Sequence, residues 1–281
     1  ALPGVKAIVT GANVPRRIGH AIRDQYPIAF DKVRYWGEPV AVVVAQTAEQ
    51  AEQARMAVNV EYEELPPLLH PHDAVAADAP LIHQDLANYE HDPLIHPIAY
   101  SNIAHHYHLE KGVVDPVFQK AHLVVENEYW MPWIAHTQLE PHGAIAFWDG
   151  EAFSIWSSSQ SPFFIRETIA HLYEISPARV RVQVPYVGGG FGGKSDVPIE
   201  PLLAICARAV PGIPVRMILT REEMYFGTVV GRGAWGRLKT AVDSQGMLLA
   251  HQVELYFGTG GNADYSVWIS QGGGHNSTGP Y

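Results

Sequence analysis

The chain has 281 residues, and its 47% hydrophobic and 10% aromatic content excludes a disordered protein and supports about two packed domains. Nineteen basic and 29 acidic residues give a net charge of −10 with no concentrated basic run, which argues against a nucleic-acid surface. No apolar run approaches the roughly 20 residues that cross a bilayer, so we expect no membrane span and a cytoplasmic location.

The first region predicts strands and one helix. Residues 39–46 form an apolar run of strand length. Thr47 and Gln50 then form a capping box, which predicts that a helix begins directly after this strand. Residues 58–65 follow the helix with the pattern of a second strand. We therefore expect a strand–helix–strand unit here.

Residues 66–100 are rich in proline and histidine and show little periodicity, which is typical of a long surface connection between domains. We therefore divide the chain into a domain of residues 1–100, which includes this connection, and a domain of residues 101–281. The second domain is expected to contain a helix that begins at Pro162 and a final loop of residues 271–281. Its strands are predicted at residues 122–130, 143–148, 152–156 and 178–187, followed by a hairpin of residues 234–242 and 247–257.

A glycine-rich loop with the sequence VGGGFGGKS occupies residues 187–195. Its glycines together cost roughly 2.5 to 5 kcal/mol of backbone entropy relative to alanine. Because glycine has no Cβ atom, the N–H groups of such a loop can approach an anion or the edge of a cofactor closely. We therefore expect this loop to hold a ligand, with a purely structural turn as the alternative.

The same loop satisfies two short nucleotide motifs. Both motifs need a helix that starts at the last glycines, so that its N-terminus faces phosphate. Pro198 and Pro201 would lie inside such a helix and break its hydrogen bonds. We expect the helix to start near Pro198 instead, while a phosphate-loop nucleotide-binding protein stays open as an alternative function. The phosphate-loop pattern GxxxxGK(S/T) is matched by Gly188, Gly193, Lys194 and Ser195, and the dinucleotide pattern GxGxxG by Gly188, Gly190 and Gly193.

Few other side chains predict chemistry. Cys206 is the only cysteine, so the chain can form no internal disulfide and hold no iron–sulfur cluster of its own. It lies in an apolar helical pattern, where we expect it to be buried. His105, His106 and His108 are neighbours, but a metal site needs further converging ligands, and we expect no protein-ligated metal. The serine nucleophile motif GxSxG is absent, which argues against a serine hydrolase.

Gln160 lies in the segment SSSQSP between a predicted strand and a predicted helix, where its amide can point toward the glycine loop or belong to a capping turn. Together with VGGGFGGK, in which Phe191 follows Gln160 by 31 residues, it resembles the xanthine dehydrogenase and aldehyde oxidase family of molybdenum hydroxylases. The segments GVKAIVTGANVP, WGEPVAVVVAQTAEQAEQA and VEYEELP are similar to the hammerhead domain of that family. The resemblance implies an α+β fold, in which a hammerhead-type α/β domain precedes the first half of a molybdopterin-binding α+β domain.

The resemblance also implies a molybdopterin-type molybdenum cofactor, in its simple or its cytosine dinucleotide form, with the metal held by the pterin dithiolene and by no protein side chain. Glu140, in the family-like segment QLEPHG, and Ser195 are candidates for the substrate pocket. Ser195 stands where purine-oxidising members carry an acidic residue, which argues against a purine substrate. The implied cofactor-binding residues are Gln160, Gly189, Gly190, Phe191, Gly192 and Gly193.

The implied enzyme oxidises a heterocycle or aldehyde carbon with water as the oxygen source. The base glutamate and the AFRGFG motif of the family belong to a segment that this sequence does not contain, so we expect no catalytic residue in this chain and activity only with other parts. The expected partners are a second molybdopterin-binding chain or a C-terminal segment, a 2Fe–2S subunit, an FAD subunit and a small-molecule substrate. Because the base and the redox centres are absent here, a non-catalytic scaffold module of a redox complex is a further alternative.

Overall fold

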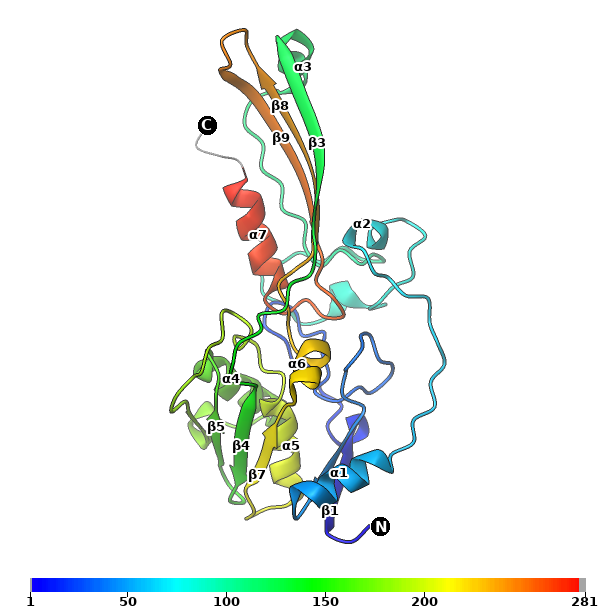
Figure 1. Ribbon diagram of the computed structural model, residues 1–281, viewed down its shortest axis with the longest axis vertical. Coiled ribbons are helices and arrows are strands. Elements are labelled where there is room, and N and C mark those ends of the chain that lie inside the picture. The colour runs from blue at the N-terminus through cyan, green and yellow to red at the C-terminus, as the bar shows by residue number, and fades with distance from the viewer. Residues whose placement is uncertain (1, 278–281) are drawn as a thin grey trace. The chain divides into compact units, whose positions relative to one another are not determined.

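The computed structural model describes residues 2–277, which form two compact units (Figure 1). The first unit comprises residues 2–19, 23–65 and 135–231, and the second comprises residues 20–22, 66–134 and 232–277. Each unit is thus assembled from three separate stretches of the chain. The predicted domain boundary at residue 100 stays a prediction. Within the described residues, no helix is long and apolar enough to span a membrane.

A four-stranded sheet with two packed helices forms the core of the first unit. Its elements are β4 (Gly143–Trp148), β5 (Phe153–Ser157), α4 (Pro162–Tyr173), β6 (Val180–Gln183), α5 (Glu200–Ala209) and β7 (Val215–Ile218). The strand order is β6–β5–β4–β7, and only β5 and β6 run parallel. A parallel pair needs a crossover, which α4 supplies. Alternate residues of β4 are buried, and the strand packs against α5, so the strand predicted at residues 143–148 is confirmed.

The core between this sheet and its helices consists of buried apolar side chains. Ile155 of β5, Ile169 of α4 and Leu203 of α5 are each fully buried in it. Cys206 lies in the same cluster, and burial raises the pKa of its thiol to about 12, so the prediction of a buried hydrophobic cysteine is confirmed.

The first unit also contains a two-stranded antiparallel sheet, β1 (Val5–Thr10) and β2 (Ala41–Ala45), followed by α1 (Ala48–Met56). The Thr47 hydroxyl accepts the N–H of Gln50 at 3.3 Å, so the predicted helix start is confirmed. The predicted strand over residues 58–65 is wrong, because these residues adopt no regular structure. Their apolar side chains are exposed and meet no partner strand, so the expected strand–helix–strand unit does not form.

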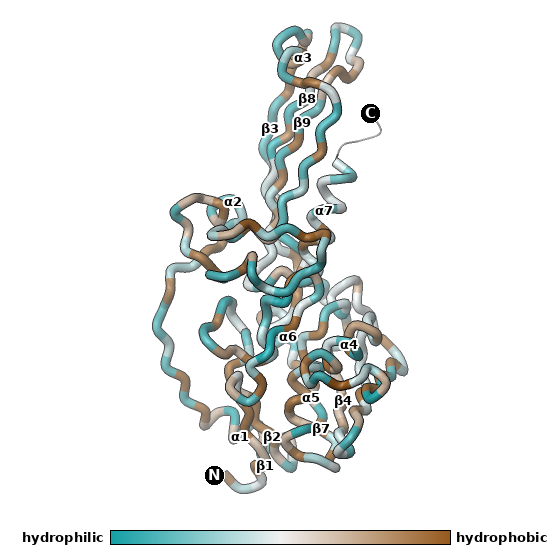
Figure 2. The backbone as a smooth tube through the Cα atoms, turned by 180° about the vertical axis from the view of Figure 1, so that it is seen from behind, coloured by the Kyte–Doolittle hydropathy of each residue, from teal (hydrophilic) through white to brown (hydrophobic). Residues whose placement is uncertain are grey.

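The second unit is built on a three-stranded antiparallel sheet with the order β3–β8–β9. Its strands are β3 (Leu123–Met131), β8 (Ala234–Val242) and β9 (Leu248–Phe257), so the predicted hairpin is confirmed. The Asp243 carboxylate closes the hairpin turn by accepting the N–H groups of Gln245 and Met247. Hydrophobic and hydrophilic stretches both occur along these strands (Figure 2), without strict alternation, and nearly all residues of β3 are exposed.

Two expectations for the second unit are wrong. Residues 66–100 are not only a surface connection, because Leu86 and Ile95 are buried in the core of this unit. Residues 271–276 belong to α7 (Ser266–Asn276) and do not form a loop, whereas residues 278–281 lie outside the described part. A Cβ atom on Gly273 would lie 2.7 Å from the Phe257 ring, so its glycine permits the close approach of α7 to β9.

The remaining elements are short. In the first unit, α6 (Arg221–Gly227) starts with a capping box in which Thr220 and Glu223 bond each other's backbone. The second unit contains α2 (Pro71–Ala74) and α3 (Asp115–Lys120). Single 3-10 turns occur at Gly11–Asn13, Leu86–Asn88 and Pro177–Arg179.

Candidate cofactor-binding site

The glycine loop lies in the first unit, between the end of β6 and the start of α5. The helix begins at Glu200 with Pro201 in its first turn, close to the predicted start and well after the last glycine. Lys194 and Ser195 therefore do not stand at a helix N-terminus. Both nucleotide motifs lack the structural context that would make them phosphate sites.

The backbone of the loop is folded into tight turns. Gly193 donates its N–H to the carbonyl of Gly190 at 2.8 Å. Gly189 and Gly192 have φ values of 96° and 94°, in the left-handed region where glycine avoids a steric penalty. Phe191 has a φ of 54°, which is unusual for a bulky residue, and its side chain is 76% exposed. The loop thus holds a strained, outward-facing aromatic residue between two glycine-dependent turns.

Gln160, at the junction of β5 and α4, is bonded to this loop. Its side-chain oxygen accepts the N–H of Gly192 at 3.1 Å and the N–H of Lys194 at 3.3 Å. Its own main-chain N–H donates to the carbonyl of Lys194 at 2.9 Å. Because two donors occupy the side-chain oxygen, the amide NH₂ is the group left for a ligand. The capping-turn interpretation of Gln160 is wrong, since its side chain bonds the loop and not the start of α4.

Three consecutive N–H groups of the loop have no protein partner. Among the described residues, the N–H groups of Gly189, Gly190 and Phe191 form no hydrogen bond. Gly190 is buried, and a Cβ atom at this position would overlap the side-chain oxygen of Gln160. Gly189 is half-buried and Phe191 is exposed, so it is the unpaired N–H of the buried Gly190 that is costly and calls for an external acceptor. Together with the NH₂ of Gln160, the three N–H groups form a set of uncharged donors that fits the oxygen-rich molybdopterin group which the sequence implied.

Glu140 and Lys194 are joined at one edge of the loop. The Lys194 side chain is fully buried, and its Nζ lies 2.5 Å from Glu140 Oε2. Partial burial acts to raise the pKa of Glu140, but the bonds from Lys194 and from the Gly188 N–H outweigh it and hold that pKa below its usual value. A lysine that is sealed inside the protein cannot reach a bound phosphate. The structure therefore gives no support to the phosphate-loop alternative.

His142 is a neighbour of the loop that the sequence analysis missed. Its Nε2–H donates to the carbonyl of Gly193 at 2.9 Å. Burial lowers the pKa of His142 to about 4, so the imidazole is neutral near pH 7. Its Nδ1 atom is buried without a hydrogen-bond partner within the described part of the chain. The sequence feature that could have indicated His142 is the segment QLEPHG, in which this histidine follows the candidate residue Glu140 by two positions.

The other candidates are placed as follows. Ser195 is half-buried, and its N–H donates to the carbonyl of Gly192 at 3.2 Å, so it continues the turn of the loop. His105, His106 and His108 lie in the second unit, and residues 2–277 contain no group of three side chains that could hold a metal ion. The chemistry of the site therefore depends on the main chain and on Gln160.

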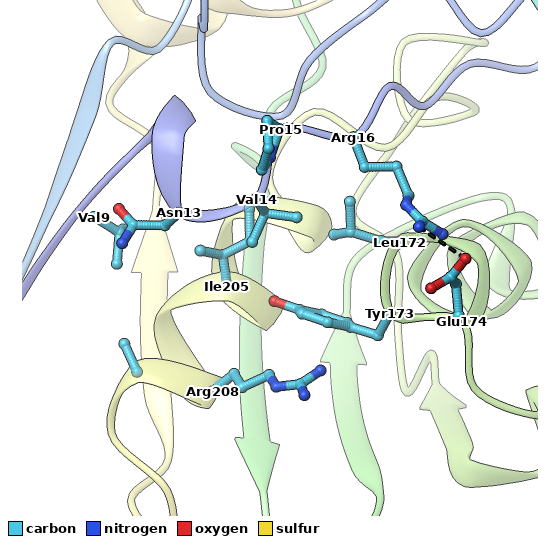
Figure 3. A pocket seen from close by; sticks show the side chains of 11 residues that line it. Val9, Asn13, Val14, Pro15, Arg16, Leu172, Tyr173, Glu174, Ile205 and Arg208 are labelled. Carbon is cyan, nitrogen blue, oxygen red and sulfur yellow. Dashed lines mark ion pairs between the residues drawn. The ribbon is translucent and has the colours of Figure 1, made fainter.

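A separate cavity of about 590 Å³ lies elsewhere in the first unit (Figure 3). Residues at the end of β1, after it, and at the C-terminal ends of α4 and α5 line this cavity. Among them, Arg16 and Glu174 form an ion pair at 2.8 Å. No residue of the glycine loop lines it, and neither does Gln160. The cavity is therefore distinct from the site built on the loop.

The glycine loop, with its unpartnered N–H groups beside a glutamine amide, is a candidate cofactor-binding site made largely of main chain. Residues 95–281 match the molybdopterin cofactor-binding domain, and residues 1–66 match the a/b hammerhead domain of aldehyde oxidase and xanthine dehydrogenase. The chain belongs to the xanthine dehydrogenase and aldehyde oxidase family of molybdopterin-binding proteins. The expected family and fold class are thereby confirmed.

Relatives in this family include the nicotinate dehydrogenase large molybdopterin subunit of Eubacterium barkeri, which is 31% identical over all of this chain and 63% of its own length. The carbon monoxide dehydrogenase large chain of Hydrogenophaga pseudoflava is 30% identical over 91% of this chain and 33% of its own length. Quinoline 2-oxidoreductase from Pseudomonas putida 86 has a similar structure, with a TM-score of 0.77 and 29% identity over 91% of this chain and 32% of that one. The chain thus spans between about a third and two thirds of the length of these two relatives.

Proposed function

We propose that this chain is the molybdopterin-binding part of a molybdenum hydroxylase that oxidises an aldehyde or heterocycle carbon with oxygen taken from water. The observation that carries the proposal is the row of unpartnered N–H groups at Gly189, Gly190 and Phe191 beside the amide of Gln160. When bound, the molybdopterin group would supply the two-electron redox centre at which the substrate is oxidised.

The residues of the loop would bind and orient this group. Gly189, Gly190 and Phe191 would donate their N–H groups to its oxygen atoms, and Gln160 would donate its NH₂ from the other side of the loop. Gly192 and Gly193 have a supporting role, since their N–H groups are already bonded to Gln160 and Gly190. Uncharged donors of this kind stabilise an oxygen-rich ligand without the desolvation cost of a buried cation.

The substrate class is proposed from the relatives. Nicotinate and quinoline, the compounds in the names of two of them, are nitrogen heterocycles, and we place this chain with enzymes that act on such rings or on aldehydes. The half-buried Ser195 and the exposed Phe191 are the proposed contacts of this substrate. The cytosine dinucleotide form of the cofactor belongs to the same proposal.

Because the chain spans only part of its relatives, the remaining machinery is proposed to lie on other segments or subunits. These are a second molybdopterin-binding part that carries the base glutamate, a 2Fe–2S subunit and an FAD subunit, in a cytoplasmic complex. Electrons would leave through the iron–sulfur and flavin centres, since the single cysteine of this chain is buried and cannot hold a cluster.

Metal and pterin analysis of the protein, purified with the chains that accompany it, tests the proposal. We expect molybdenum in a near-stoichiometric amount, together with an extractable pterin. A preparation that contains neither molybdenum nor tungsten and no pterin would contradict it and would favour the scaffold alternative.

A further inference from the structure

One carboxylate holds the glycine loop at both of its ends. Glu140 Oε2 accepts the N–H of Gly188, which opens the loop, at 2.6 Å, and it contacts Nζ of Lys194, which closes the loop, at 2.5 Å. The main-chain N–H of Glu140 also donates to the carbonyl of Gly188 at 3.2 Å. Moving this carboxylate would therefore release both ends of the loop together.

Lys194 depends on this carboxylate because its side chain has no access to solvent. An ammonium group in a protein interior needs a counter-charge, and Glu140 supplies one within ion-pair distance. The backbone of Lys194 is also the partner of Gln160, which bonds both its N–H and its carbonyl. The position of the lysine therefore sets the position of the glutamine amide.

Arg221, the first residue of α6, fixes the segment from which Glu140 projects. Its guanidinium donates to the carbonyl of Gln138 at 2.7 Å and to the carbonyl of Leu139 at 2.8 Å. Both carbonyls belong to the two residues directly before Glu140. Arg221 at the start of α6 thus fixes the position of the Glu140 carboxylate, which in turn holds the glycine loop.

We propose that Glu140 and Lys194, supported by Arg221, are a positioning pair that sets which N–H groups of the loop face the cofactor. This inference rests on the proposed function and deepens it, because it assigns to Glu140 and Lys194 a role that touches neither substrate nor cofactor. The pair acts through Gly188 and Gln160, which it holds in place from behind. Glu140 is thereby a positioning residue and not a substrate-pocket residue.

The test replaces Glu140 by aspartate in the protein purified with its accompanying chains. Glu140→Asp keeps the negative charge beside Lys194 but shortens the side chain, so it cannot contact Lys194 and Gly188 at once. We expect amide hydrogen exchange across residues 188–194 to become at least about tenfold faster, as expected for lost loop hydrogen bonds. We also expect molybdenum and pterin content to fall about tenfold, while the exchange of β8 and β9 in the second unit stays unchanged.

Glu128→Asp is the matched control, because Glu128 forms an exposed ion pair with Arg237 at 2.9 Å in the second unit. It should change neither loop exchange nor cofactor content. Wild-type exchange in Glu140→Asp would overturn the inference, and so would faster exchange with full cofactor content, since the pair would then be merely structural.

If Glu140→Asp does not fold, the double variant Glu140→Gln/Lys194→Met tests the inference instead. It removes both charges of the pair together and so leaves no unpaired charge. A folded double variant with low cofactor content supports the inference, and one with full content overturns it. If the wild-type protein itself holds no molybdenum or pterin, the proposed function fails. Hydrogen exchange then tests only whether the pair holds the loop, with faster loop exchange in Glu140→Asp supporting that part of the inference and unchanged exchange overturning it.

Discussion

The side-chain oxygen of Gln160 lies 3.1 Å from the main-chain nitrogen of Gly192 and accepts its hydrogen. This bond decides which end of the glutamine amide is available, because an oxygen that already serves the loop leaves the NH₂ group for a ligand. The glycine loop and the glutamine, which are far apart in the sequence, therefore act as one donor surface.

Replacing Gln160 by glutamate separates the two functions of this side chain. The introduced carboxylate would be able to accept the loop N–H groups but could donate nothing, so Gln160→Glu should keep the fold and lose cofactor. A hydrogen bond to a charged acceptor contributes about 1.5–3 kcal/mol, so we expect cofactor retention to fall by about tenfold or more. Pterin fluorescence and molybdenum content of the purified complex measure the effect. Retention equal to that of the wild type would show that the NH₂ group has no ligand.

Replacing Gly190 by alanine tests the close contact between the loop and Gln160. The new Cβ atom would overlap the side-chain oxygen of Gln160 and displace the amide. We expect Gly190→Ala to lose most of the bound cofactor, with a drop of only about 1–3 kcal/mol in the free energy of unfolding. Gly272→Ala, in α7, is the control, because its Cβ atom would meet open space. A loss of cofactor in both variants would point to a general loss of stability.

His142 should make the protein less stable in mild acid. Its pKa in the folded state is about 4, below the usual value near 6.5, so the unfolded chain binds more protons between these two values. Stability from the neutral imidazole is present above pH 6.5 and is lost as the pH falls toward 4, by about 2 kcal/mol between pH 7 and pH 5. Urea unfolding of the wild type and of His142→Gln at both pH values measures it. The variant should show a smaller difference between pH 7 and pH 5 than the wild type does.

Glu200 should have the opposite pH dependence. It is buried at the start of α5, where Ser157 bonds one of its oxygens, and burial raises the pKa of this carboxyl. Stability that comes from the protonated form is present below the usual pKa of a glutamate and is lost as the pH rises through the folded value. We therefore expect Glu200→Gln to stabilise the protein at pH 8 by about 1 kcal/mol or more and to change little at pH 4. Thermal unfolding of the wild type and of Glu200→Gln at the two pH values measures the effect. A variant that is less stable than the wild type at pH 8 would contradict this prediction.

Much of the fold could be predicted from local signals. β4 occupies the predicted residues because alternate burial in a sheet leaves a period of two in the sequence. α1 starts where Thr47 and Gln50 indicated, since the Thr47 hydroxyl satisfies a backbone N–H group within the first turn. The strand predicted over residues 58–65 does not form, because residues with strand propensity form a strand only beside a partner strand, and no strand pairs with this segment.

The site could be predicted only in part. The glycine loop and Gln160 were identified from the motif and the resemblance, and the structure places them in hydrogen-bond contact. The connection from Glu140 to Lys194 joins residues 54 positions apart, and no local pattern reports which way a lysine side chain points. The buried imidazole of His142 was missed for the same reason, because its environment is made by Gly193 across the loop.

The assembly of the first unit from three stretches has a consequence for protein synthesis. Val9 and Val44, in the first 65 residues, belong to the same buried cluster as Leu203 of α5. The early segment cannot complete its hydrophobic contacts until the ribosome has released the chain to about residue 210, and contacts of such long sequence separation form slowly. Nascent chains that stall before this point would expose apolar strands, and they are the species for which we expect chaperone dependence.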